Sequence, residues 1–223
     1  MPELAENADV VDEAGKCESE LGLSRVRAAA YRRIIERYAD AIRQGETKTV
    51  PQLKELILPH DASIAKAVDK LFNDMGRGTT AEGLVSFSFD RDFLDYAKTA
   101  LKFVQSLSMI HSEVGVPFWM TPKDIIEIGA ADSFDRALFY CSLLVSAGNS
   151  DARVRVVALD GGERHPLVVF TFENRFFAAD PCGQQPLLDG ENPDAILREL
   201  SIDGKRFIRS VFEFNNEDYE EFD

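Results

Sequence analysis

Residues 133–148 (SFDRALFYCSLLVSAG) constrain the fold most strongly, because they have helical spacing and few polar side chains. A helix that is this apolar has to be buried on most of its sides. Runs rich in Val and Phe follow at 152–159, 166–173 and 175–180, and the turns between them contain Gly-Gly or Glu-Asn. Short extended runs joined by tight turns predict antiparallel strands. The sequence therefore predicts an α+β fold, with this helix packed against an antiparallel sheet.

The rest of the chain divides by composition and periodicity. Apolar residues at helical spacing predict further helices at 24–44, 50–60, 62–76 and 90–111, and a last apolar run predicts a strand at 205–214. Acidic, weakly apolar stretches at both ends predict solvated tails. The expected organisation is an acidic tail at 1–20, a helical module at 21–82, a core at 83–214 and a second acidic tail at 215–223.

Charge and cysteine content limit the class of protein. The 223 residues carry 39 acidic and 25 basic side chains, a net charge of −14, which argues against nucleic acid or an anionic membrane as partner. No apolar run is long enough to cross a bilayer, and the acidic start does not resemble a signal peptide. The sequence spacing typical of metal ligands is absent among the three cysteines, Cys17, Cys141 and Cys182, and His60 and His111 have no partner at such a spacing either. We expect a cytoplasmic protein that needs no cofactor and no metal.

Three residues are candidates for chemistry. Ser133 lies at the predicted start of the buried helix, where free backbone N–H groups and the helix dipole stabilise an oxyanion. His165 opens one predicted strand, and Asp180 ends the next. Neighbouring antiparallel strands can bring an imidazole and a carboxylate together, and the carboxylate then orients the ring. The residue types and their order predict a nucleophile, a base and an orienting acid.

Residues 119–148 (WMTPKDIIEIGAADSFDRALFYCSLLVSAG), followed by Ala-Arg-Val, resemble the transglutaminase-like superfamily of papain-type folds. Members of that family have a similar Trp-Thr-Pro lead, a Gly-Asp-Cys motif, a helix that ends in Gly and an Ala-Arg-Val strand. His165 and Asp180, which precedes Pro181, match the family's catalytic His and Asp. The resemblance covers roughly residues 93–190. It implies amide hydrolysis or acyl transfer on a protein or peptide, with Trp119 flanking the cleft and offering its indole N–H.

The chain departs from the family at the nucleophile, because Ser133 occupies the position of the catalytic cysteine and Asp132 keeps the preceding acid. A hydroxyl is a much weaker nucleophile than a thiolate. Cys141 lies too far along the same helix to replace it, and Cys182 lies beyond the end of a strand. Three explanations stay open: a deliberate Cys→Ser substitution that traps an inactive protein, a true serine hydrolase, or a silent site that only binds. The alternative function is a pseudoenzyme, a non-catalytic protein-binding or scaffolding protein of unknown oligomeric state with the same fold.

Overall fold

The computed structural model describes residues 21–33, 35, 50–79, 86–110, 119–202 and 204–222. Residues 21–33 are helical, and the named helices are α2 (Val50–Lys54), α3 (Ala62–Asp74), α4 (Phe89–Gln105), α5 (Pro122–Ile128), α6 (Ser133–Ser146) and α7 (Pro193–Glu199). The strands are β1 (Ser108–Met109), β2 (Ala130–Ala131), β3 (Arg153–Leu159), β4 (Arg164–Phe172), β5 (Arg175–Ala179), β6 (Leu188–Gly190), β7 (Ser201–Ile202), β8 (Lys205–Phe214) and β9 (Tyr219–Glu221). The expected tail at 1–20, Cys17 and His111 lie outside the described residues.

The main sheet is antiparallel, with the strand order β6-β5-β4-β3-β8-β7 and β9 paired to β8. β4 and β5 form a hairpin in which Phe172 pairs with Arg175, so that only Glu173 and Asn174 make the turn. Both turn residues have positive φ, 51° and 61°, as a type I′ turn requires. The predicted hairpin is confirmed, and its register decides which residues meet at the far end of β4.

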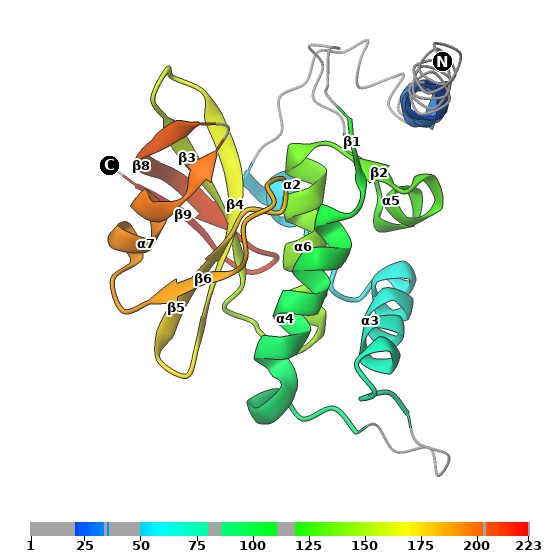
Figure 1. Cartoon of the computed structure of the whole chain (residues 1–223), viewed down its shortest axis with the longest axis horizontal. Helices are drawn as coiled ribbons and strands as arrows, with labels where there is room; N and C mark the ends of the chain where they lie inside the picture. The colour runs from blue at the N-terminus through cyan, green and yellow to red at the C-terminus, as the bar shows by residue number, and fades with distance from the viewer. Residues whose placement is uncertain are drawn as a thin grey trace, which may run out of the picture.

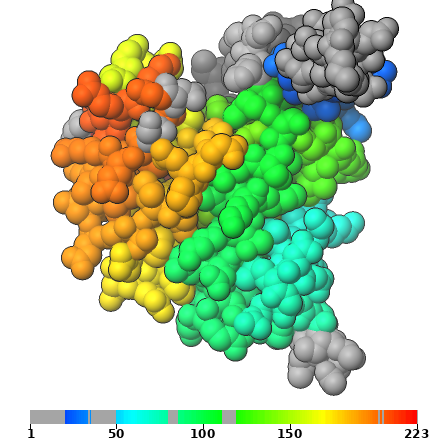
Figure 2. All heavy atoms as spheres, viewed as in Figure 1, coloured from blue at the N-terminus to red at the C-terminus, as the bar shows by residue number. Residues whose placement is uncertain are grey.

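Helix α6 lies at the centre of the fold. It contacts β3 and β4 on one side, and α3 and α4 on the other (Figure 1). Every residue of α6 from Asp135 to Leu144 is buried, as its apolar sequence predicts. Figure 2 shows the C-terminal strands on one side of the molecule, α4 beside them and α3 on the far side of α4. The predicted α+β fold, with a buried helix against an antiparallel sheet, is confirmed.

The sheet is covered on both faces. On β4, Val168 and Phe170 belong to the hydrophobic cluster shared with α6, whereas Leu167 and Val169 belong to a second cluster with Ile196 and Leu197 of α7. Side chains alternate between the faces of a strand, so the continuous apolar run of β4 requires a cover on each face. The first cluster also includes the buried residues of α3. The boundary expected near residue 82 therefore does not separate two hydrophobic cores.

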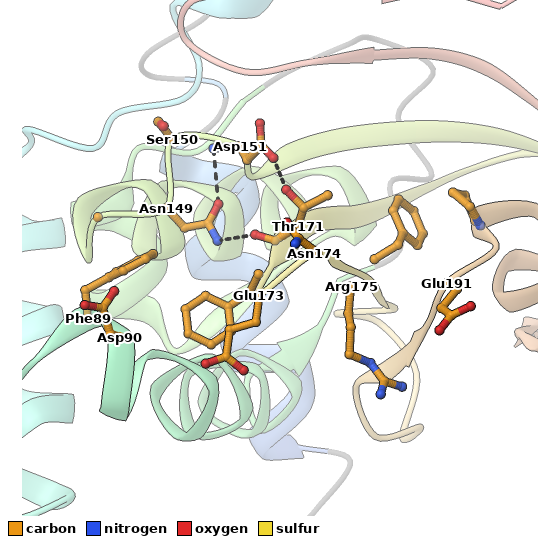
Figure 3. A pocket seen from close by; sticks show the side chains of 14 residues that line it. Phe89, Asp90, Asn149, Ser150, Asp151, Thr171, Glu173, Asn174, Arg175 and Glu191 are labelled. Carbon is orange, nitrogen blue, oxygen red and sulfur yellow. Dashed lines mark hydrogen bonds between the residues drawn. The ribbon is translucent and has the colours of Figure 1, made fainter.

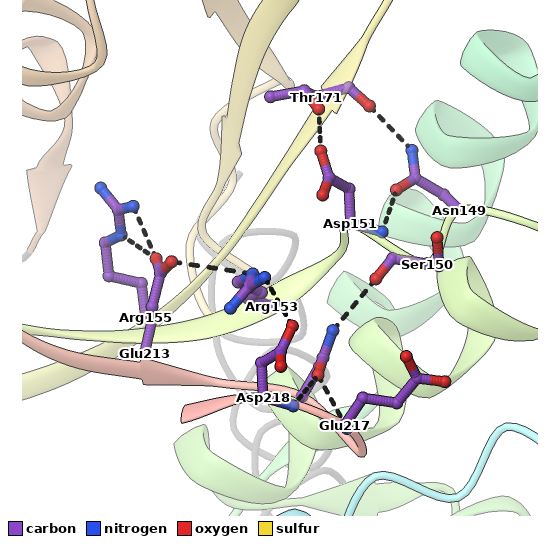
Figure 4. Close-up of polar contacts among 10 residues, drawn as sticks. Asn149, Ser150, Asp151, Arg153, Arg155, Thr171, Glu213, Glu217 and Asp218 are labelled. Atoms are coloured by element: carbon purple, nitrogen blue, oxygen red, sulfur yellow. Dashed lines mark hydrogen bonds and ion pairs between the residues drawn. The ribbon is translucent and has the colours of Figure 1, made fainter. Parts of the chain in front are cut away.

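Within 215–223, the segment expected to be an acidic tail, Tyr219–Glu221 forms strand β9 and pairs with β8. Glu213 of β8 lies opposite Arg155 of β3 and accepts a hydrogen bond from its Nε at 2.7 Å (Figure 4). Asn215 Oδ1 then accepts the backbone N–H groups of Glu217 and Asp218, which turns the chain back into β9. The acidic composition suggested solvation, but this turn, the pairing of β9 with β8 and the ion pair between Arg153 and Asp218 hold residues 215–221 in place.

One further expectation was wrong in detail, and two helices were missed. The helix expected at 90–111 ends at Gln105, and Ser108–Met109 instead pairs in parallel with β2. Helices α5 and α7 were not expected, although each begins with an N-cap residue followed by proline, Thr121-Pro122 and Asn192-Pro193. None of the described helices is long and apolar enough to cross a bilayer.

Candidate functional site

Ser133 is the first residue of α6. The N-cap residue Asp132 accepts a hydrogen bond from the backbone N–H of Asp135 at 2.8 Å, which accounts for the start of the helix at this point. Burial raises the pKa of the Asp132 carboxyl. The N–H of a first helical residue has no acceptor within its own helix, so the Ser133 N–H is available to an oxygen placed at the helix end.

His165 and Asp180 come together because β4 begins where β5 ends. Their side chains are only 13% and 4% exposed, and His165 Nε2 lies 3.0 Å from Asp180 Oδ1. Asp180 Oδ1 also accepts the backbone N–H of Cys182 at 2.9 Å. A Cβ at Gly183 would lie 2.8 Å from Asp180 Oδ2, so only glycine allows the backbone to approach this closely. The carboxylate is thus held between the ring and the loop that follows β5.

The predicted nucleophile, base and acid line one cavity of about 720 Å³. Ser133, His165 and Asp180 reach it from α6, β4 and the end of β5, and Asp132 also lines it. Trp119, expected to flank this cleft, packs instead edge-on against Phe134 with ring centroids 5.1 Å apart, and it is not part of the cavity lining. Its role in the cleft stays a prediction.

Cys182 also lines the cavity, although its position beyond the end of a strand gave no reason to expect it there. Its Sγ, His165 Nε2 or Nδ1 and a carboxylate oxygen of Asp180 all lie within 4.8 Å of one another. The thiol also contacts the Ser133 carbonyl oxygen at 3.5 Å. Continuing the register of the β4–β5 hairpin places His165 opposite position 182, so the turn and the strand pairing together could have found it. Burial, and then the charge of Asp180, raises the pKa of the Cys182 thiol, which disfavours the thiolate.

Arg136 joins α6 to the loops around the site. It is 3% exposed, and its guanidinium donates to the carbonyl oxygen of Pro181 at 3.4 Å and to that of Leu107. These contacts fix the segment that carries Asp180 and Cys182 against the first turns of α6. No sequence motif marked Arg136, because both of its acceptors are backbone atoms distant in sequence.

Asp135 is a buried acid behind the site. It is 1% exposed, Oδ1 accepts the Met120 N–H at 3.1 Å, and Oδ2 has no partner within the described part of the chain. Burial and then the charge of Asp132 raise the pKa of the Asp135 carboxyl well above its usual value. The native state therefore holds this proton more tightly than the unfolded chain does.

We expect Asp135→Asn to flatten the dependence of stability on pH. Because the folded pKa of Asp135 is raised, the natural protein loses stability as pH rises from about 4 towards that pKa, by up to about 1.4 kcal/mol per pH unit. The Asn oxygen still accepts the Met120 N–H but cannot ionise. Urea unfolding of both proteins between about pH 4.5 and 8 measures the slope. The exposed Asp95→Asn is the matched control, and an unchanged slope in Asp135→Asn would refute the assignment.

Three other cavities among the described residues are lined by none of the predicted site residues. One of them, about 830 Å³, lies between the start of α4, residues 148–151 and the β4–β5 turn (Figure 3). Asn149 Nδ2 donates to the Thr171 carbonyl there, and Asp151 accepts from the Thr171 hydroxyl. These contacts fasten the loop between α6 and β3 to the end of β4, which gives Asn149, Asp151 and Thr171 a structural role. His60 is exposed, and Cys141 is fully buried in α6 with the pKa of its thiol raised by burial.

Comparison with known proteins finds similarity among solved structures. No family model and no curated protein matches this chain. Solved structures of Legionella pneumophila LapG match at 16% identity, with TM-scores of 0.48 for two forms, one of them EGTA-treated, and 0.49 for the calcium-bound form. The matches cover 78% of this chain and 86% to 88% of the LapG chains. A likeness at this identity and TM-score does not establish a family.

Proposed function

We propose that this chain carries an acyl-transfer site of the transglutaminase-like type, directed at protein or peptide amides in the cytoplasm, with Ser133 in the nucleophile position. One observation carries the proposal. Ser133, His165 and Asp180 come from three separate elements, line one cavity, and include an imidazole bonded to a buried carboxylate at 3.0 Å. This is the arrangement of nucleophile, base and orienting acid that acyl transfer uses on unrelated folds.

Each residue has one role in the reaction. Asp180 holds His165 Nε2, and Nδ1 has no hydrogen-bond partner among the described residues, so Nδ1 is the nitrogen available to take a proton. Ser133 Oγ attacks the amide carbonyl carbon while its proton passes to His165, and the Ser133 N–H donates to the oxyanion. The proton then goes to the leaving amine, which leaves an acyl-serine. Water or a second amine attacks this acyl group, and Ser133 regains its proton.

A second candidate is a silent site that binds a protein or peptide without turnover. Within the described residues, Ser133 Oγ makes no hydrogen bond to His165, and a serine hydroxyl cannot form the thiolate–imidazolium pair of a papain-type site. Both features favour binding over chemistry. The two candidates share the cleft and differ only in whether Ser133 reacts.

The test of the proposed geometry is the reactivity of Ser133→Cys. We expect the new thiol to react with dilute chloroacetamide at pH 6 about tenfold faster than an ordinary thiol, because pairing with His165 raises the thiolate fraction more than it lowers the nucleophilicity. Adding His165→Ala should remove the excess rate. Peptide mass spectrometry separates this label from labels on Cys17 and Cys182, and a chelator is present throughout.

Ser150→Cys, at an exposed position, supplies the ordinary thiol in the same chain. Slow labelling of Ser133→Cys that is indifferent to His165 would refute the triad geometry. If Ser133→Cys is labelled rapidly, the natural protein is then incubated with a peptide aryl ester. Acylation of Ser133 there would support turnover, and its absence would favour the binding function.

A further inference from the structure

The cleft brings together a second chemical set that includes Cys182 and does not involve Ser133. It consists of His165 from β4, and Asp180 and Cys182 from the loop that follows β5. His165 offers a ring nitrogen, Asp180 a carboxylate oxygen and Cys182 its thiol sulfur. These three atoms lie within 4.8 Å of one another. All three residues line the 720 Å³ cavity, so a fourth position beside them is open.

The spacing fits a tetrahedral transition-metal ion. With zinc bonds of about 2.0–2.1 Å to nitrogen or oxygen and 2.3 Å to sulfur, neighbouring ligand atoms lie about 3.3–3.6 Å apart. The His165–Asp180 distance of 3.0 Å is slightly shorter than this, and no distance within the set exceeds 4.8 Å. If the His165 and Asp180 ligand atoms shifted by a few tenths of an ångström and the Cys182 thiol rotated about χ1, the three residues would occupy three corners of a tetrahedral site.

We propose that His165, Asp180 and Cys182 form a binding site for a zinc-like divalent ion, with the fourth position open to the cleft. The donor set decides the class of metal. A thiolate and an imidazole select borderline ions such as Zn²⁺ or Co²⁺, whereas Ca²⁺ and Mg²⁺ prefer sets made only of oxygen. This site goes beyond the acyl-transfer proposal and does not depend on it.

Binding involves a balanced exchange of charge. The ion displaces the Cys182 thiol proton to solvent, so the thiolate and the Asp180 carboxylate bring two negative charges to a divalent cation. The positive charge of Arg136 lies close to Cys182 and Asp180 and opposes a cation there. The carboxylate of Asp132 also interacts with Arg136 and offsets part of that positive charge. Asp180 Oδ1 keeps the Cys182 N–H, which orients the carboxylate towards the other two donors.

The ion and the proposed base exclude each other. A neutral imidazole has one acceptor nitrogen, and a metal on Nε2 places the remaining proton on Nδ1. The ring then cannot take a proton from Ser133. An ion in this site would therefore turn off acyl transfer in the natural chain, and removing it would restore the base.

The test is a titration of the natural, full-length protein, stripped with a chelator, with Co²⁺ and then Zn²⁺. We expect one equivalent of Co²⁺ to produce a thiolate-to-cobalt charge-transfer absorption, which one equivalent of Zn²⁺ displaces. Cys182→Ser should abolish this band. His165→Ala and Asp180→Asn should each weaken Zn²⁺ binding about a hundredfold or more, because loss of groups that only orient ligands already costs about 10- to 100-fold.

Matched controls use residues of the same kind outside the set. Cys17→Ser, Cys141→Ala and His60→Ala should leave the band and the affinity unchanged. A band that survives Cys182→Ser, binding that is indifferent to His165→Ala, or no one-to-one binding would overturn the proposal. Each variant's circular dichroism is compared with that of the natural chain, and Cys182→Ala repeats the test if Cys182→Ser is unfolded. None of these results depends on the reactivity of Ser133.

Discussion

Arg136→Met is expected to lower the free energy of unfolding by about 3 kcal/mol, because two hydrogen bonds from a charged donor to backbone carbonyls are lost, each worth about 1.5–3 kcal/mol. Methionine fills much of the same volume, so the loss reports the polar contacts. For a chain of this size, we expect the melting temperature to fall by about 6–12 °C. Thermal unfolding followed by circular dichroism measures this shift.

Arg136→Lys is the matched control for charge. It keeps a positive charge beside Asp132 and Asp180 but cannot reach both carbonyls with a planar fork, so about half of the loss should remain. In the Ser133→Cys background, Arg136→Met should also slow labelling at pH 6, because the loop that carries Asp180 is no longer held against α6. An unchanged melting temperature would show that the guanidinium contacts contribute nothing net to stability.

Phe93→Ala is expected to cost about 3–5 kcal/mol, the usual range for truncation of a buried aromatic ring. Phe93 of α4 is fully buried, and its ring centroid lies 5.6 Å from that of Phe170 and 5.2 Å from that of Phe172, both on β4. The ring therefore joins the helical layer to the strand that carries His165. Urea unfolding measures the loss, and the midpoint should fall without a change in the m-value.

Two substitutions calibrate this result. Phe93→Leu keeps most of the volume and should cost about 1–2 kcal/mol, and Ile126→Ala, at a side chain that is 40% exposed, should cost less than about 1 kcal/mol. If Phe93→Ala cost no more than Ile126→Ala, Phe93 would not pack between α4 and β4.

Local sequence signals predicted several elements correctly and left others out for identifiable reasons. The helix at 133–146 and the β4–β5 hairpin follow from apolar spacing and from a Glu-Asn turn. Helices α5 and α7 are only seven residues long, too short for periodicity to show, although Thr121-Pro122 and Asn192-Pro193 are start signals. Strand β9 was missed because its stability comes from pairing with β8, and its own composition is acidic.

For this chain, the sequence by itself determined the buried helix, the run of antiparallel strands, and the positions of Ser133, His165 and Asp180 at the ends of these elements. Such features depend on neighbours only a few residues away. The tertiary structure alone decided that Arg136 would join α6 to two loops, and that Cys182 would lie beside His165 and Asp180. The contacts of Arg136 and the approach of Cys182 to His165 join residues 17 to 45 positions apart, and they arise only when strand register and helix packing are in place.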